Sequence, residues 1–222
     1  MKHYIVLMRA ALIGMFLTLA ACTTAVPPEE PTIVGIPGSH APVPPVTTIH
    51  CDTDFTDGER TELLAAAELW RLQTSGLAHI ILTWDVDFQS TQDLQAHVDA
   101  KHNIMLRMES WMKTVVDEDK ETGASLLGIV SPSGGIHNPW RKPFTVGFVA
   151  DRFGLTFTTR ATLTQVALHE FGHVLGVPHQ EAAGAIMFHY AIKSATVCLK
   201  KPDLSAFCSV NECGSYKMHP CE

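Results

Sequence analysis

The sequence has no excess of basic residues. Its 222 residues include 16 Lys and Arg against 23 Asp and Glu, for a formal net charge of −7. Proteins that bind nucleic acid neutralise backbone phosphates with a basic surface, and no stripe rich in Lys or Arg runs through this chain. We therefore expect no nucleic-acid partner.

Long hydrophobic runs are also missing. The N-terminal run, Ala10–Ala21, has 12 residues, whereas a helix needs about 20 to cross a bilayer. Lys2 and Arg9 give the segment a positive start. A charged start followed by a short apolar run is typical of a secretion signal, so we assign residues 1–21 to a signal peptide.

The predicted signal ends in Leu19-Ala20-Ala21-Cys22, which resembles the lipobox of bacterial lipoproteins. The resemblance implies cleavage before Cys22, lipidation of that residue and anchoring of the chain to a membrane. It implies location in the bacterial cell envelope, and in the outer membrane of a Gram-negative host because no Asp follows the cysteine. An ordinary signal peptide cut after Ala21 is the alternative.

Residues 22–49 are rich in proline. Seven of the 13 prolines fall between residues 23 and 49. This composition favours extended polyproline II geometry, which rises about 3.1 Å per residue. We predict a tether that holds a domain at residues 50–222 away from the membrane. A short inhibitory pro-segment is the alternative.

The remaining chain has the pattern of an α+β domain. Helices are predicted over Glu59–Gln73 and within Gln89–Ala100, strands over Ala78–Phe88, Leu126–Ser131 and Thr145–Ala150, and a last helix from near Leu163. Asn103–Met108 fits either a strand or part of a helix that continues toward Val116. Thr162 and Gln165 form a capping-box pattern at the start of the last helix.

Four of the six cysteines lie in the last 25 residues, at Cys198, Cys208, Cys213 and Cys221. This clustering predicts a disulfide-stapled tail over about residues 198–222 and an oxidising compartment. With Cys22 lipidated an odd number remains, so one cysteine is free or bonded between chains. We expect two disulfides drawn from the tail cysteines and, as a further candidate, Cys51.

The most informative stretch runs from His169 to His179. His169 and His173 are four residues apart, so a helix places both imidazoles on one face. Glu170 lies about 100° further round, where it reaches a metal-bound water rather than the metal. Gly176 allows the chain to reverse and bring His179 back as a third ligand. Three imidazoles leave one tetrahedral position open, as in catalytic zinc sites.

This stretch fits H-E-x-x-H-x-x-G-x-x-H at every fixed position, and so resembles the metzincin zinc metalloproteases. Metzincins also carry a methionine in a tight turn beneath the metal, and Met187 follows His179 by eight residues. The predicted elements over Glu59–Phe88 resemble the start of a matrixin-like domain, here of a bacterial lipoprotein type. Tyr190 departs from the astacin and serralysin pattern, because His189 occupies the position of their switchable Tyr ligand.

The resemblance implies a metzincin-like zincin catalytic domain with a twisted mixed β-sheet, a long zinc-binding helix, a Met-turn and a cysteine-rich C-terminal tail. It implies a zinc-dependent endopeptidase in which Glu170 assists attack of zinc-bound water on a peptide bond. Met187 and Gly176 would then be structural supports of the site. By analogy, an extended substrate would add as a strand at the sheet edge near Leu126–Ser131.

Glu170 separates this function from its alternative, a catalytically silent lipoprotein that keeps zinc for stability and serves in surface binding or adhesion. A purely structural zinc site needs no general base. We therefore expect one catalytic Zn²⁺, a protein or peptide substrate and a monomeric chain. The Pro-Arg-Cys-Gly latency motif of vertebrate matrixins is missing. Cys51 either pairs with a tail cysteine or is a free thiol that caps the zinc in a latent form.

Other residues give less specific expectations. Asp151 and the pair Asp85 and Asp87 are candidates for a structural Ca²⁺ of the kind that matrixins bind, with a solvated strand end as the simpler interpretation. The nine histidines outside the zinc motif are expected to be separate surface residues. Among these nine, three are singled out for comparison with the structure: His137, His189 and His219.

Overall fold

A computed structural model describes residues 46–108, 128–132, 143–149, 162–188, 197–211, 213–214 and 217–221. The predicted signal peptide, Cys22 and most of the tether lie outside these residues. So do four side chains singled out above: His137, Asp151, His189 and Tyr190. Within the described residues, no helix combines the length and apolar character needed to cross a membrane.

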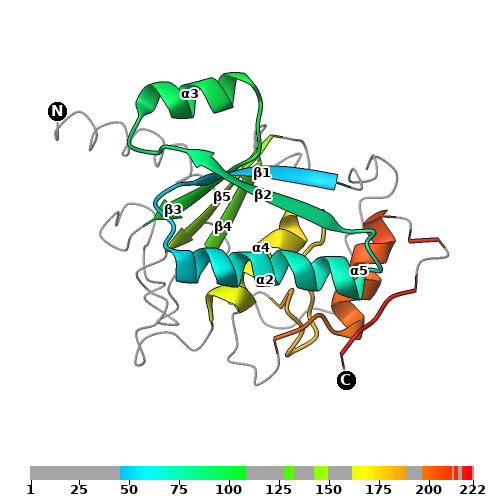
Figure 1. Ribbon diagram of the computed structural model, residues 1–222. Coiled ribbons are helices and arrows are strands. Elements are labelled where there is room, and N and C mark those ends of the chain that lie inside the picture. Colours follow the sequence, from blue (N-terminus) through cyan, green and yellow to red (C-terminus); the bar gives the residue numbers. More distant parts are fainter. Residues whose placement is uncertain are drawn as a thin grey trace, which may run out of the picture.

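The described chain forms four helices and five strands (Figure 1). In chain order they are β1 (Val46–Asp52), α2 (Asp57–Gln73), β2 (His79–Val86), α3 (Thr91–Asp99), β3 (Ile104–Met108), β4 (Gly128–Pro132), β5 (Phe144–Val149), α4 (Leu163–Val174) and α5 (Lys201–Asn211). The α+β class is confirmed. Asn103–Met108, which the sequence left undecided, contributes strand β3.

The strands form one mixed sheet in the order β2-β1-β3-β5-β4. β1 pairs in parallel with β2 and β3, β3 pairs in parallel with β5, and β4 runs antiparallel to β5 at the edge of the described sheet. β1 includes residues 46–49, which the composition assigns to the tether, so the sheet begins ahead of the predicted boundary at residue 50. The reason is the β-branched run from Val46 to Ile49, which directly follows the last proline and favours a strand.

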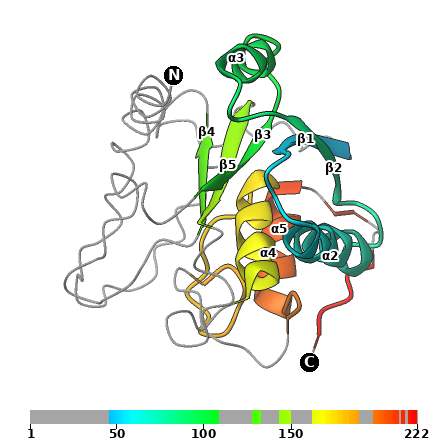
Figure 2. The same cartoon turned by 60° about the vertical axis from the view of Figure 1, so that its left-hand side comes forward.

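The helices divide between the two faces of the sheet. α2 and α4 pack on one face and α3 lies on the other, with α5 beside α4 (Figures 1 and 2). Side chains alternate along β1 accordingly. Ile49 and Cys51 are fully buried in the main core, whereas His50 between them is only partly buried and points to the α3 face. A smaller apolar cluster, which includes Val86 and Leu94, fills the space beneath α3.

Trp70 joins the two helices of the main core. Its ring is fully buried, and Nε1 donates a hydrogen bond of 2.9 Å to the backbone oxygen of Leu168 in α4. Satisfying this polar atom allows a large apolar side chain to be buried without an orphaned donor. The capping box of Thr56 and Glu59 fixes the start of α2, so the stripe that carries Trp70 faces α4.

The C-terminal tail is fastened to the end of α2. Two disulfides, Cys198–Cys221 and Cys208–Cys213, lie in the tail. Both were within the predicted set of tail cysteines. Gln73 also holds the tail, because its side-chain amide bonds both backbone groups of Leu199, at 2.8 and 3.0 Å, and the oxygen of His219, at 2.8 Å. His219 therefore contributes its backbone to this contact.

Among the described cysteines, Cys51 is the one outside these two disulfides. Its thiol is buried in the main core and donates to the oxygen of Ile49 at 3.3 Å. Burial, with the charge of Asp85 as a smaller cause, raises the pKa of the Cys51 thiol well above its ordinary value. Of the two alternatives for Cys51, pairing with a tail cysteine is wrong, because the four tail cysteines pair with one another. The thiol is free, as in the second alternative, but it lies in the main core and bonds Ile49, so its capping of a metal stays untested.

Candidate metal centre

The helix α4 places His169, Glu170 and His173 at its C-terminal end. A capping box formed by Thr162 and Gln165 fixes the helix start. The helix ends in a Schellman motif, in which the N–H of Gly176 bonds the oxygen of His173 and the N–H of Val177 bonds the oxygen of Gly172. Gly176 has a φ of 84°, which suits glycine and turns the chain back toward the helix.

This reversal brings His179 to the other two histidines. The three Nε2 atoms form a nearly equilateral triangle, with sides of 3.1, 3.2 and 3.2 Å. The Nδ1 atoms of His169 and His173 face backbone oxygens instead, those of Ile186 at 2.7 Å and Val177 at 2.9 Å. These carbonyls fix the tautomer in which Nδ1 carries the proton and Nε2 presents a lone pair.

Such an arrangement fits a cation. Two Nε2 lone pairs that face each other at hydrogen-bond distance repel unless a positive charge lies among them. A tetrahedral zinc with Zn–N bonds of 2.0–2.1 Å separates its imidazole nitrogens by about 3.3 Å, close to the sides of this triangle. Burial first, then the neighbouring His169 and His179, lowers the pKa of His173 well below its ordinary value, which keeps the ring in the neutral form that binds metal.

Glu170 directly follows His169 in α4 and is buried, with 6% of its surface exposed. Burial raises the pKa of this carboxyl to about 8. The neutral form is favoured because an apolar site does not solvate a carboxylate. Gly128 of β4 is adjacent: a Cβ there would lie 2.8 Å from both Cγ and Oε1 of Glu170. A glycine in the edge strand thus leaves room for the carboxyl.

Met187 lies in a turn closed by a bond from the N–H of Phe188 to the oxygen of Ala185, at 3.3 Å. Its side chain is fully buried against Gly172 of α4. The preceding residue, Ile186, supplies the oxygen that faces His169. The turn therefore has two roles: Met187 forms part of the apolar floor of the site, and Ile186 orients the imidazole of His169.

Asp203 of α5 holds this turn in place. Its carboxylate is fully buried and accepts backbone hydrogen bonds from Ile186 at 3.1 Å, Met187 at 2.8 Å and Lys200 at 2.8 Å. No sequence pattern pointed to this residue, because nothing in its spacing indicates that α5 packs under the turn. Gly172 was also overlooked, although a glycine inside a helix is itself a signal of close packing.

The structure brings the three histidines of the motif together, with Glu170 beside them. Of the calcium candidates, Asp151 lies outside the described residues, and Asp85 and Asp87 make separate contacts. Asp85 accepts a hydrogen bond from Thr83 and faces His50, while Asp87 bonds the backbone of Gln89. Among the described residues, both groups suited to a metal ion consist of histidines.

The second of these groups overturns one expectation. His50, His97 and His102, all predicted to be separate surface residues, lie within reach of one another. They were missed because their spacings of 47 and 5 residues match no ligand pattern, and only the sheet brings β1 next to α3 and β3.

One of three comparisons with known proteins identifies a family for this chain. A search of curated proteins finds no significant match. The crystal structure of metalloproteinase-II from Bacteroides fragilis is similar, with 14% sequence identity, a TM-score of 0.44 and coverage of 90% of this chain. The aligned region spans 60% of the length of that protein. The family model of the matrixins matches residues 48–210, nearly the whole described domain. This chain belongs to the matrixin family.

Proposed function

We propose that the chain is a zinc-dependent endopeptidase, held at a bacterial membrane surface by a lipid on Cys22. The proposal of an enzyme is supported by the triangle of Nε2 atoms from His169, His173 and His179, which lies beside the buried carboxyl of Glu170. A structural zinc site needs four protein ligands and no adjacent base. Three ligands and one carboxyl suit hydrolysis.

The three imidazoles would hold the ion. A bound Zn²⁺ supplies Lewis acidity, which lowers the pKa of water toward about 7 and stabilises negative charge on a carbonyl oxygen. The oxygens of Ile186 and Val177 keep the rings of His169 and His173 aimed at the ion. Because these partners are backbone atoms of two packed turns, the ligand geometry is fixed before the ion binds.

Glu170 moves the proton. In the protein without metal its pKa of about 8 keeps it largely neutral at pH 7. A cation nearby favours the carboxylate, which then accepts a proton from the attacking water and delivers it to the leaving amine. A carboxyl whose pKa lies near neutral pH can both accept and donate the proton, because both of its protonation states are accessible at that pH.

The edge strand β4 is the proposed place for the substrate. It borders the described sheet, and its first residue, Gly128, adjoins Glu170. An extended peptide that adds to this edge gains backbone hydrogen bonds and lies near the carboxyl. Met187 supports the reaction only indirectly, through the turn beneath the rings.

The enzymatic proposal is tested with the purified full chain on casein and a peptide library. We expect cleavage that a chelator abolishes and Zn²⁺ restores. Glu170→Gln should lower kcat by about 10²- to 10⁴-fold while the zinc content stays the same. Glu68→Gln, an exposed glutamate on α2, is the matched control and should retain activity. Undiminished turnover by the Glu170 variant would contradict the mechanism, and inactivity of the wild type toward every substrate would favour a binding protein.

The anchor rests on the lipobox-like Leu19-Ala20-Ala21-Cys22 and the proline-rich segment after it. Mass spectrometry of the N-terminus of membrane-derived protein should find an acylated Cys22. Cys22→Ser should release the protein from the membrane fraction without loss of zinc or activity. An unmodified residue 22 in the membrane fraction would refute the anchor and leave the enzymatic proposal standing.

A further inference from the structure

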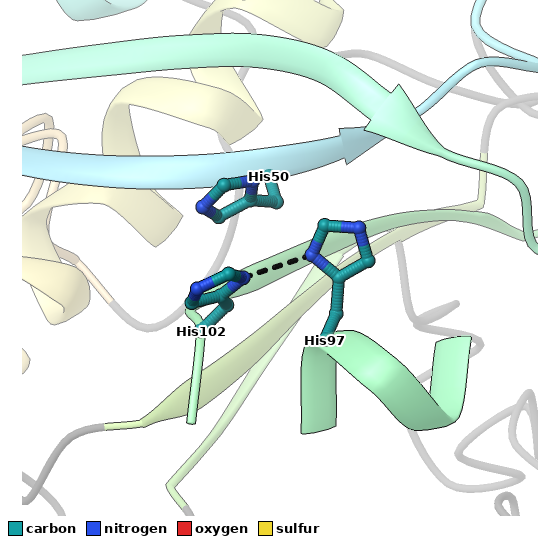
Figure 3. Close-up of side chains that lie close together, drawn as sticks. All are labelled: His50, His97 and His102. Atoms are coloured by element: carbon teal, nitrogen blue, oxygen red, sulfur yellow. Dashed lines mark hydrogen bonds between the residues drawn. The ribbon is translucent and has the colours of Figure 1, made fainter. Parts of the chain in front are cut away.

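His50, His97 and His102 converge on the face of the sheet opposite α4. His50 is on β1, His97 is in the last turn of α3, and His102 is in the connection to β3 (Figure 3). The Nδ1 atoms of His97 and His102 are 2.9 Å apart, and the His50 ring centroid lies 4.1 Å from that of His102 and 4.9 Å from that of His97. One ring nitrogen from each histidine lies within 4.8 Å of the others.

The end of α3 creates this proximity. The N–H of His102 bonds the oxygen of His97, and the N–H of Lys101 bonds that of Val98, which together form a Schellman motif. Lys101 has a φ of 56°, in the region usually left to glycine. In this motif the two positions occupied by His97 and His102 come into side-chain contact, and apolar residues usually fill them. Here both are histidines.

Two hydrogen bonds hold the connection between α3 and β3 against β1. The N–H of His50 donates to the oxygen of Asn103 at 2.8 Å, and the side-chain amide of Asn103 donates to the oxygen of Thr48 at 2.9 Å. These two bonds place His102 beside His50. The three imidazoles therefore come from segments fixed relative to one another by the sheet.

Asp85 completes the arrangement as an orienting carboxylate. Its Oδ2 lies 2.8 Å from Nδ1 of His50, and its Oδ1 accepts from the hydroxyl of Thr83 at 3.0 Å. A carboxylate on Nδ1 fixes the proton there and leaves Nε2 with a lone pair, the usual arrangement of a metal-binding histidine. The His50 side chain is 19% exposed, so an ion has access from solvent.

The geometry points to a second metal centre, in which His50, His97 and His102 bind one divalent transition-metal ion of the zinc class. Imidazole nitrogens are preferred ligands of Zn²⁺, Cu²⁺ and Ni²⁺ and poor ligands of Ca²⁺ or Mg²⁺. Binding requires the His50 and His102 rings, now stacked with an interplanar angle of 11°, to turn so that their lone pairs meet at one point. The ion would join β1, α3 and the start of β3.

This centre is independent of the proposed proteolysis, so metal content is the primary test. The full chain is dialysed against Zn²⁺ and analysed by elemental mass spectrometry. We expect two ions per wild-type chain, one per His97→Gln chain and two per His79→Gln chain, the control on β2. Protease activity of the His97 variant should be retained, which would identify the ion at His169, His173 and His179 as the one that remains.

Variant folding is verified by circular dichroism, and His102→Gln provides a second substitution at the same centre. One ion per wild-type chain would overturn the proposal. So would two ions in folded His97→Gln and His102→Gln chains. Loss of the second ion from the His79 control as well would also overturn it, because the loss would then not be specific to the cluster.

Discussion

Gly172 lies in the last turn of α4, where an added methyl group would meet the fully buried side chain of Met187. A Cβ built at this position lies 2.9 Å from Cε of Met187, closer still to its sulfur, and 3.2 Å from Cζ2 of Trp70. Both neighbours are fully buried, so neither can swing into solvent. Gly172→Ala must therefore displace Met187, Trp70 or the helix itself.

The magnitude follows from two opposing effects. Alanine stabilises a helix by about 1 kcal/mol relative to glycine, whereas overpacking a closed core destabilises by about 1–3 kcal/mol. Gly58→Ala supplies the matched control, because Gly58 lies in α2 with nothing within 4 Å of its added Cβ. The helix preference largely cancels between the two variants. We therefore expect Gly172→Ala to be less stable than Gly58→Ala by about 1–3 kcal/mol.

Thermal unfolding in the presence of chelator measures this difference. For a domain of this size, 1 kcal/mol corresponds to about 2–4 °C, so the two melting temperatures should differ by about 2–12 °C. Zinc affinity is the second measurement. Displacing Met187 moves Ile186, whose oxygen faces Nδ1 of His169, and loss of such an orienting partner typically weakens metal binding about 10- to 100-fold.

The result that would refute this reasoning is a Gly172→Ala protein as stable as Gly58→Ala, with unchanged zinc affinity. The Met187 side chain would then have space to move, and the contact beneath the imidazoles would have no part in holding them. A Gly172→Ala protein that is less stable but binds zinc with full affinity would contradict only the expected loss of zinc affinity. The packing of Met187 would then not affect the orientation of His169.

Three further predictions concern charged groups. Glu170→Gln should stabilise the metal-free protein by up to about 5 kcal/mol at pH 8 and little at pH 4.5, as measured by urea unfolding. The reason is the raised pKa of Glu170, which makes the wild type lose stability as the pH rises from 4.5 toward 8. The same dependence of stability on pH in the variant and the wild type would contradict this. Asp203→Asn should lower zinc affinity, measured by competition with a chelating dye, because two N–H groups of the Met187 turn lose a charged acceptor. The control is Asp57→Asn, at an exposed position of α2. Burial acts to raise the pKa of Glu59, but the hydrogen bonds and charge of Arg107, together with hydrogen bonds from Thr56, outweigh it and lower the pKa. These contacts should therefore stabilise the fold above about pH 4.5 and cease to do so as the carboxyl protonates. A Glu59→Gln variant that loses the same stability at pH 3 as at pH 7 would refute this.

The sequence predicted the class of fold and most of its elements, because those depend on local patterns. Glu59–Gln73 has the apolar stripe of a helix, and Thr162 with Gln165 has the capping pattern that the structure contains. β1 was missed because its β-branched run follows a proline-rich segment and gains its stability from pairing with β2 and β3. The sequence pattern of one strand does not show which distant strands it pairs with.

By itself the sequence determined the candidate metal centre of His169, His173 and His179. Its ligands lie on one helix and the turn after it, so their spacing fixes their positions to within a side-chain rotation. Only the tertiary structure decided what surrounds them. Asp203 reaches the Met187 turn from α5, and Gly128 approaches Glu170 from the sheet edge.

The same distinction explains the cluster of His50, His97 and His102. The spacing of five residues between the last two matters only because α3 ends in a Schellman motif, and His50 joins them only because β1 lies beside β3 in the sheet. Ligands carried by one local element can be recognised from sequence spacing. Ligands that come from separate strands and helices are defined by packing, which the order of residues alone does not reveal.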